Sequence, residues 1–77
     1  MKLKEITDID LIVFLVTKGH LINKSKKEGN KSIIYFEDNK ELQKNILKFV
    51  NRNENINISD YQAAHRRVKT LLYANKN

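Results

Sequence analysis

The feature that most constrains the fold is the apolar run from Leu11 to Val16. It is far shorter than the roughly 20 residues that span a membrane, so we expect a core element. Thr7 followed by Asp10 has the form of a capping box, and Gly19 stands where a left-handed residue ends a helix. The β-branched residues of the apolar segment also fit a strand, but the capping signals at both ends favour a helix over Asp8–Lys18. Because this helix is apolar nearly all round, we expect it in the middle of the structure or against a second copy.

Length and composition predict a single small domain. The chain has 77 residues, a net charge of +6 and no Cys, Pro or Trp. A domain of this size buries only about 60% of the surface of its unfolded chain. Without cysteine we expect no disulfide, no thiolate metal site and no thiol nucleophile, and a cytoplasmic location without a membrane partner. Acidic residues interrupt the N-terminal stretch, which argues against a signal peptide. We expect one domain over 1–77, with an ordered core of about 6–74 and loose ends at Met1–Glu5 and Asn75–Asn77.

After the first helix, the pattern predicts a β-hairpin. Two short strands, His20–Ser25 and Lys31–Phe36, are joined by a polar loop that contains Gly29. In the second strand, Ile34 and Phe36 face one side, while the equally apolar Ile33 and Tyr35 face the other. We therefore expect the second strand to be covered on both faces.

Two further helices complete the expected order. Asp38 with Glu41 is a capping signal for a helix over Asn39–Asn51. The residues that follow, Arg52–Ile58, form an Asn-rich connector. In this connector, Ile56 and Ile58 are expected to anchor on the core. Ser59 is the expected cap of the last helix, whose narrow apolar stripe comprises Tyr61, Ala64, Val68, Leu71 and Leu72, with Gln62, Arg66, Lys69 and Tyr73 about opposite. The predicted fold is a small α+β domain in the order helix-strand-strand-helix-helix, with a two-stranded antiparallel hairpin.

Short motifs in a shared order link the chain to a known family. They are Thr7-Asp8, Phe14-Leu15, Lys18-Gly19-His20 and Phe36-Glu37-Asp38, followed by Tyr61, Ala64, Lys69 and Leu72. On these positions the chain resembles a family of short uncharacterised domains, of unknown function, found mostly in Gram-positive bacteria and their phages and mobile elements. The resemblance implies a phage or mobile-element setting and transfers no catalytic residue. The hairpin and connector are richer in Lys and Asn here than in the family.

Residues suited to catalysis or metal binding have simpler structural roles. Only two histidines occur, His20 and His65, and no acidic cluster at metal-ligand spacing accompanies them. We expect His20 to bond the last carbonyls of the first helix, and His65 to pack beside the apolar stripe with one ring nitrogen bonded. Most carboxylates fall at predicted helix N-termini, where the helix dipole favours them. We therefore predict a protein that is not an enzyme and has no metal site and no cofactor.

The basic residues are the feature of the sequence that points to a binding function. The hairpin carries four lysines against one glutamate, and Lys40, Lys44, Lys48 and Arg52 align along the second predicted helix. The candidate contacts with nucleic acid or another partner are Lys24, Lys26, Lys27, Lys31, Lys44, Lys48, Arg52, Arg66, Arg67, Lys69 and Tyr73. Several cations on one side, with Tyr or Arg to stack, suit a phosphate backbone. A solvated helix face accounts for the same lysines without a ligand.

Three hypotheses of function follow. The first is a small basic binding module that contacts nucleic acid, DNA or RNA, through its Lys/Arg surface. The second is a protein-interaction module, such as a phage factor that docks on or inhibits a host or defence protein, with the cations steering encounter. The third is a homodimer through the first or last helix. A ribbon-helix-helix DNA binder is disfavoured because Ile33, Ile34, Tyr35 and Phe36 are too apolar for a DNA groove.

Overall fold

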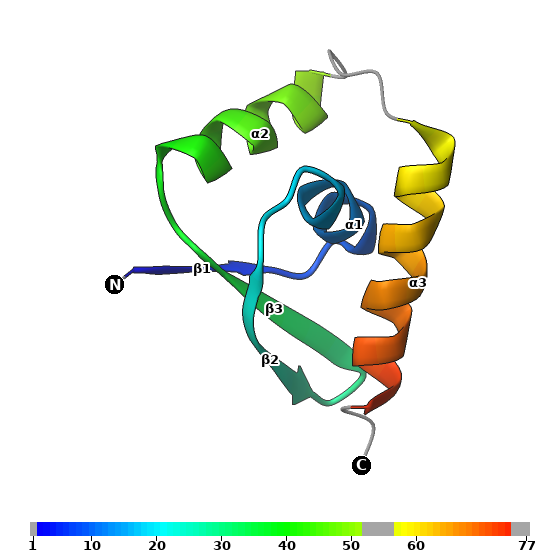
Figure 1. Ribbon diagram of the computed structural model, residues 1–77. Coiled ribbons are helices and arrows are strands. Elements are labelled where there is room, and N and C mark those ends of the chain that lie inside the picture. The colour runs from blue at the N-terminus through cyan, green and yellow to red at the C-terminus, as the bar shows by residue number, and fades with distance from the viewer. Residues whose placement is uncertain (1, 52–56, 75–77) are drawn as a thin grey trace.

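The computed structural model describes residues 2–51 and 57–74, the last two as backbone alone. Within this part the protein is a small α+β domain in which a three-stranded antiparallel sheet packs with three helices (Figure 1). The elements are β1 (Leu3–Ile6), α1 (Ile9–Thr17), β2 (Ile22–Glu28), β3 (Lys31–Glu37), α2 (Lys40–Asn51) and α3 (Ile58–Ala74). The fold class is the expected one, and the order is strand-helix-strand-strand-helix-helix.

Strand β1 corrects the predicted order. It pairs antiparallel with β3, which makes β3 the central strand, and Ile6 lies opposite Ile34. The expectation that Met1–Glu5 is loose is therefore wrong from Leu3 onward, while Met1 lies outside the described residues. Ile6 is the one fully buried side chain of this four-residue strand. With a single buried position, the sequence carries no readable alternation, which is why the strand was missed.

The hairpin is longer and lies later in the chain than predicted. His20 and Leu21 precede β2, while Lys26 and Lys27, expected in the loop, pair with Ile33 and Ser32. The register shifts between Ile22 and Lys24, which leaves Asn23 as an extra residue in β2. Gly29 closes the tight turn with φ of +60°. The longer pairing places alternate lysines on opposite faces of the sheet.

Helix α1 forms as predicted and lies at the centre, between α2 and α3 (Figure 1). Its cap is Asp8, not Thr7, because the Asp8 carboxylate accepts from the N–H groups of Asp10 (2.9 Å) and Leu11 (3.3 Å). The expected end is confirmed: Gly19 has φ of +95° and donates to the Val16 carbonyl at 3.0 Å. Of the two expected placements, α1 takes the central one.

The other two predicted caps are also displaced by a residue or two. In α2, Asn39 Oδ1 accepts from the Leu42 N–H at 2.8 Å, whereas Asp38 accepts from the Gln43 side chain. In α3, Asn57 Oδ1, rather than Ser59, accepts from the Asp60 N–H at 3.2 Å. Asn caps as well as Asp or Ser, so neighbouring polar residues compete for the position and the sequence does not decide between them.

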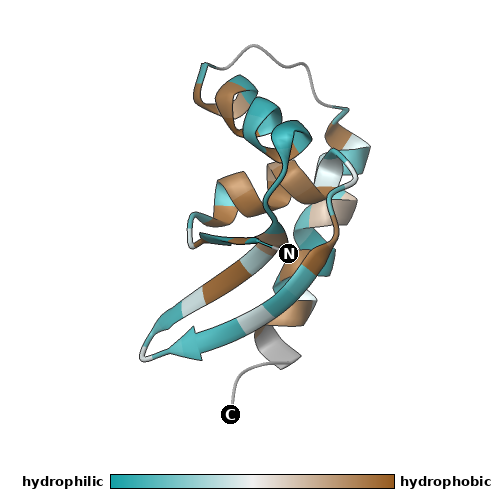
Figure 2. Ribbon diagram, turned by 90° about the vertical axis from the view of Figure 1, so that its left-hand side faces the viewer, coloured by the Kyte–Doolittle hydropathy of each residue, from teal (hydrophilic) through white to brown (hydrophobic). Residues whose placement is uncertain are grey.

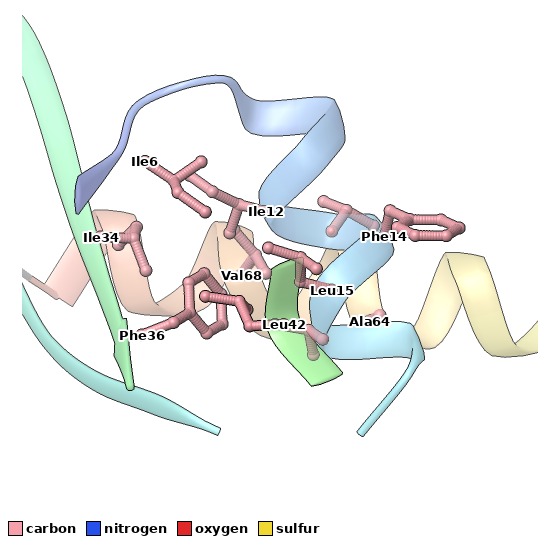
Figure 3. Packing of buried hydrophobic residues seen from close by; sticks show 11 residues of the cluster. Ile6, Ile12, Phe14, Leu15, Ile34, Phe36, Leu42, Ala64 and Val68 are labelled. Carbon is pink, nitrogen blue, oxygen red and sulfur yellow. The ribbon is translucent and has the colours of Figure 1, made fainter. Parts of the chain in front are cut away.

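The core lies between the sheet and the helices. Ile34 and Phe36 of β3 point toward Ile12 and Leu15 of α1, and Leu42 of α2 joins them (Figure 3). Helix α3 contributes its predicted stripe: Ala64 and Val68 are buried, and Tyr61, Leu71 and Leu72 pack against the cluster. Ile58 is 73% exposed, so its expected anchoring on the core is wrong, and Ile56 lies outside the described residues. The apolar residues gather on the helices and the core strand, whereas the hairpin tip is hydrophilic (Figure 2).

The opposite face of the sheet is only partly covered. Ile33 is buried although it lies outside the core cluster, and Tyr35 is half-buried. Lys24 Nζ lies 4.9 Å from the Tyr35 ring centroid, in cation–π range. The Lys24 stem on the neighbouring strand β2 therefore contributes to the cover of this face.

Candidate nucleic-acid interface

The hairpin and α3 meet at a cavity that carries two of the predicted cations. Its volume is about 380 Å³, and its lining residues are Ile9, Lys27, Ser32, His65, Val68, Lys69 and Leu72. Lys27 and Ser32 are direct partners in the β2–β3 register, on the same face as Ile34 and Phe36, which is the face that meets the helices. Lys69 lies one helical turn beyond His65. Cations from distant parts of the chain thus reach one hollow.

A second cavity opens beside the first along α3. It measures about 650 Å³ and is lined by Ile58, Tyr61, Gln62, His65 and Arg66. His65 lines both cavities, so they adjoin along α3, and together they are here called the α3 groove. The Tyr61 and His65 rings lie 6.5 Å apart between centroids, tilted by 35°. His65 is exposed, which corrects the expectation that it packs beside the apolar stripe.

The two ends of the α3 groove differ electrostatically. Burial raises the pKa of Tyr61, and the carboxylates of Asp10 and Asp8 at the start of α1 raise it further. The phenol therefore keeps its proton and its capacity to donate a hydrogen bond. The acidic start of α1 thus acts on the Tyr61 end, which also carries Arg66, while Lys27 and Lys69 line the other cavity.

The remaining predicted contact residues lie elsewhere. Lys24, Lys26 and Lys31 lie on the opposite face of the sheet, where Lys26 pairs with Glu28 at 3.3 Å. Arg67 lines a different cavity, with Val16 and Leu71, and Lys44 and Lys48 lie on α2. Arg52 and the side chain of Tyr73 are outside the described residues. Of the predicted set, Lys27, Arg66 and Lys69 are the residues that line the α3 groove.

His20 has a different role from the one expected. Its backbone N–H, not its ring, bonds the Leu15 carbonyl, at 3.0 Å. The ring nitrogen Nε2 lies 2.8 Å from Nδ2 of Asn45, which is 5% exposed and links α2 to the end of α1. Burial lowers the pKa of His20, and Glu41 partly opposes this shift. A neutral ring that accepts from the Asn45 amide is consistent with a structural role.

The groove contains residues that sequence reasoning did not assign to a site. Tyr61 was assigned to the core and His65 beside it, while Ser32 and Gln62 were given no ligand role. A signal for α3 does exist, because Ile58, Tyr61, Gln62 and His65 recur at helical spacing next to the apolar stripe. Asn45 was also missed, although it shares the helical face of Leu42 and Phe49, where a polar residue is unexpected.

In the described ranges, no group of three or more His, Asp or Glu residues could hold a metal ion. In residues 2–51 and 57–74 no helix has the length and apolar character needed to cross a membrane. The groove offers two amines, a guanidinium, an imidazole, two hydroxyls and an amide beside apolar side chains. This set can bind oxyanions and flat apolar groups.

Comparison with known proteins identifies a family. The sequence model of the family described as a domain of unknown function (DUF5659) matches residues 1–74. No curated protein and no solved structure matches the chain.

Proposed function

Because this chain belongs to DUF5659, a family described only as a domain of unknown function, we propose a function from its own residues: a small, basic, non-catalytic module that contacts nucleic acid. Lys27 and Lys69 bind phosphates at the cavity that they share, and Arg66 extends the contact along the α3 groove. The observation that carries the proposal is the meeting of hairpin and α3 cations at one cavity. The setting that we propose is the cytoplasm of a host cell, with the protein encoded by a phage or mobile element.

The energetics favour such contacts. Lys27, Arg66 and Lys69 are exposed, so binding a phosphate costs them little desolvation. Each neutralised phosphate releases counterions, and this release supplies most of the affinity of non-specific binding. The net charge of +6 also steers a polyanion toward the protein. Ser32, in the same cavity, adds a hydroxyl donor for a phosphate oxygen.

Titration of labelled DNA and RNA at 50 and 200 mM salt tests the proposal. Three phosphate contacts predict an affinity loss of roughly 20- to 40-fold between these salt concentrations. Lys27→Gln/Lys69→Gln removes two contacts and is expected to weaken binding at low salt by about tenfold. Lys40→Gln/Lys44→Gln on α2 makes the same change in net charge and is the matched control, expected to change affinity less than about twofold. Absence of binding at low salt, or equal loss in both variants, contradicts the proposal.

A second function is favoured by exposed apolar residues. Leu47 and Val50 of α2 are 61% and 66% exposed, and Leu21 is 84% exposed. Such residues suit a protein-interaction module that docks on or inhibits a host or defence protein. A partner recovered from nuclease-treated host lysate, and lost on Leu47→Ser/Val50→Ser but not on Lys27→Gln/Lys69→Gln, supports this function. A monomeric mass by light scattering over a wide concentration range excludes the third hypothesis, a homodimer through α1 or α3.

A further inference from the structure

The Tyr61 end of the α3 groove is more apolar than phosphate binding requires. Its lining residues include two rings, Tyr61 and His65, and the side chain of Ile58, which is 73% exposed. Phosphate contacts come from cationic groups and from hydroxyl, amide and N–H donors, and gain nothing from the face of an aromatic ring. Apart from Arg66, the residues that line this larger cavity thus lack a role in the function proposed above.

Charge and shape together define what fits this end. The ligand must offer a flat apolar face to the Tyr61 and His65 rings, and negative charge to Arg66 in the same cavity and to Lys69 and Lys27 farther along. His65 and Lys69 are four residues apart on one helix, a rise of about 6 Å, so both requirements apply within a short distance. Unpaired nucleotides combine a stacking face with a phosphate in this way. In a duplex, the base faces are covered by neighbouring base pairs.

We propose that the Tyr61–His65 part of the α3 groove stacks an unpaired base of single-stranded nucleic acid, whose phosphates lie on Arg66, Lys69 and Lys27. The inference rests on the proposed function and specifies its ligand. Gln62 stands beside the rings and has an amide that can both donate to and accept from a base edge. Stacking tolerates any base, so we expect little sequence preference.

Three labelled probes of 12 nucleotides or base pairs test the inference at low salt: single-stranded oligothymidine, an abasic strand with the same backbone charge, and a duplex. The single strand is expected to bind about tenfold more tightly than the abasic strand, since stacking contributes a factor of this order per base. The duplex, whose bases are already stacked, is expected to show no such preference.

His65→Ala is the informative variant because the ring is exposed and its loss leaves the core intact. It is expected to abolish the preference for the single strand over the abasic strand while leaving affinity for the abasic strand within about twofold. His65→Phe restores a flat ring and is expected to restore the preference. Tyr35→Leu, on the opposite face of the sheet, is the control and leaves the preference unchanged.

The outcomes separate this inference from the function on which it rests. Equal binding of the three probes, still weakened by Lys27→Gln/Lys69→Gln, overturns base stacking and leaves the phosphate site standing. Loss of the preference on Tyr35→Leu instead of His65→Ala also overturns it. An amphipathic Glu/Leu peptide that binds more tightly than the single strand and depends on His65 assigns the groove to a protein ligand. No binding of any probe removes both proposals.

Discussion

Helix α2 is attached to the rest of the protein through one face, and Leu42 is the residue on which this attachment most depends. Leu42 is fully buried, whereas Leu47 of the same helix is 61% exposed. Leu42→Ala removes the buried methyl groups and leaves a cavity, at a cost of about 3 kcal/mol. A 77-residue domain has a total stability of roughly 4–12 kcal/mol, so the variant loses a large part of it. The corresponding fall in Tm is roughly 12–24 °C.

Urea unfolding followed by circular dichroism at 222 nm measures this cost. Leu47→Ala changes helix propensity by the same amount at an exposed position of α2, and we expect it to change the free energy of unfolding by less than about 0.5 kcal/mol. Equal losses of stability in the two variants contradict the proposed dependence of α2 on Leu42. A cost below about 1 kcal/mol for Leu42→Ala also refutes it, because such a value denotes a residue that the core does not enclose.

Three further predictions concern the two glycines with positive φ, the buried residue of β1 and the pKa of His20. Gly19→Ala forces an L side chain to φ of +95°, although no atom within 4 Å clashes with it. We expect it to lower the free energy of unfolding by about 1–2 kcal/mol, measured by thermal unfolding. Gly29→Asn, at φ of +60°, is expected to stay near wild type, because Asn tolerates the left-handed region. Ile6→Ala is expected to cost about 2–4 kcal/mol if β1 closes the core, and a neutral result contradicts the position of that strand. Burial lowers the pKa of His20 below 6.5 in the folded protein, so the unfolded chain binds the proton more readily. The contribution of His20 to stability is therefore complete above pH 6.5 and is lost as the pH falls through the pKa of the folded state. His20→Gln is expected to lessen this dependence, and an NMR titration of His20 at or above 6.5 opposes it.

The helices were predictable where apolar pattern and punctuation agree. Leu11–Val16 between capping residues and Gly19 defines α1, and the stripe through Ala64 and Val68 defines the buried face of α3. Strand β1 was not predictable, because its pairing with β3 depends on a long-range contact that one buried residue, Ile6, does not reveal. Cap positions failed by one or two residues because adjacent Asp, Asn, Ser and Thr compete on nearly equal terms.

The candidate site was predictable only in part. Lys27, Arg66 and Lys69 are visible as cations in the sequence, but their common groove is a property of the fold. The sequence predicts that the first hairpin strand ends at Ser25, which places Lys27 in a loop where the direction of its side chain is undefined. In the structure β2 pairs with β3 as far as Glu28, and this pairing turns the Lys27 side chain to the face that meets α3. The same alternation sends Lys26 to the other face. Tyr61 combines both roles, since it packs against the core and lines the groove.

The location of the polyanion site is tested most directly by NMR. ¹⁵N-labelled protein is titrated with the single-stranded 12-mer at low salt, and the amide shifts are mapped on the sequence. A site in the α3 groove predicts the largest changes at Lys27, Ser32, His65 and Lys69, and little change in α2 and on the Tyr35 face. Largest changes centred on Lys40 and Lys44, or on Lys24 and Tyr35, contradict it.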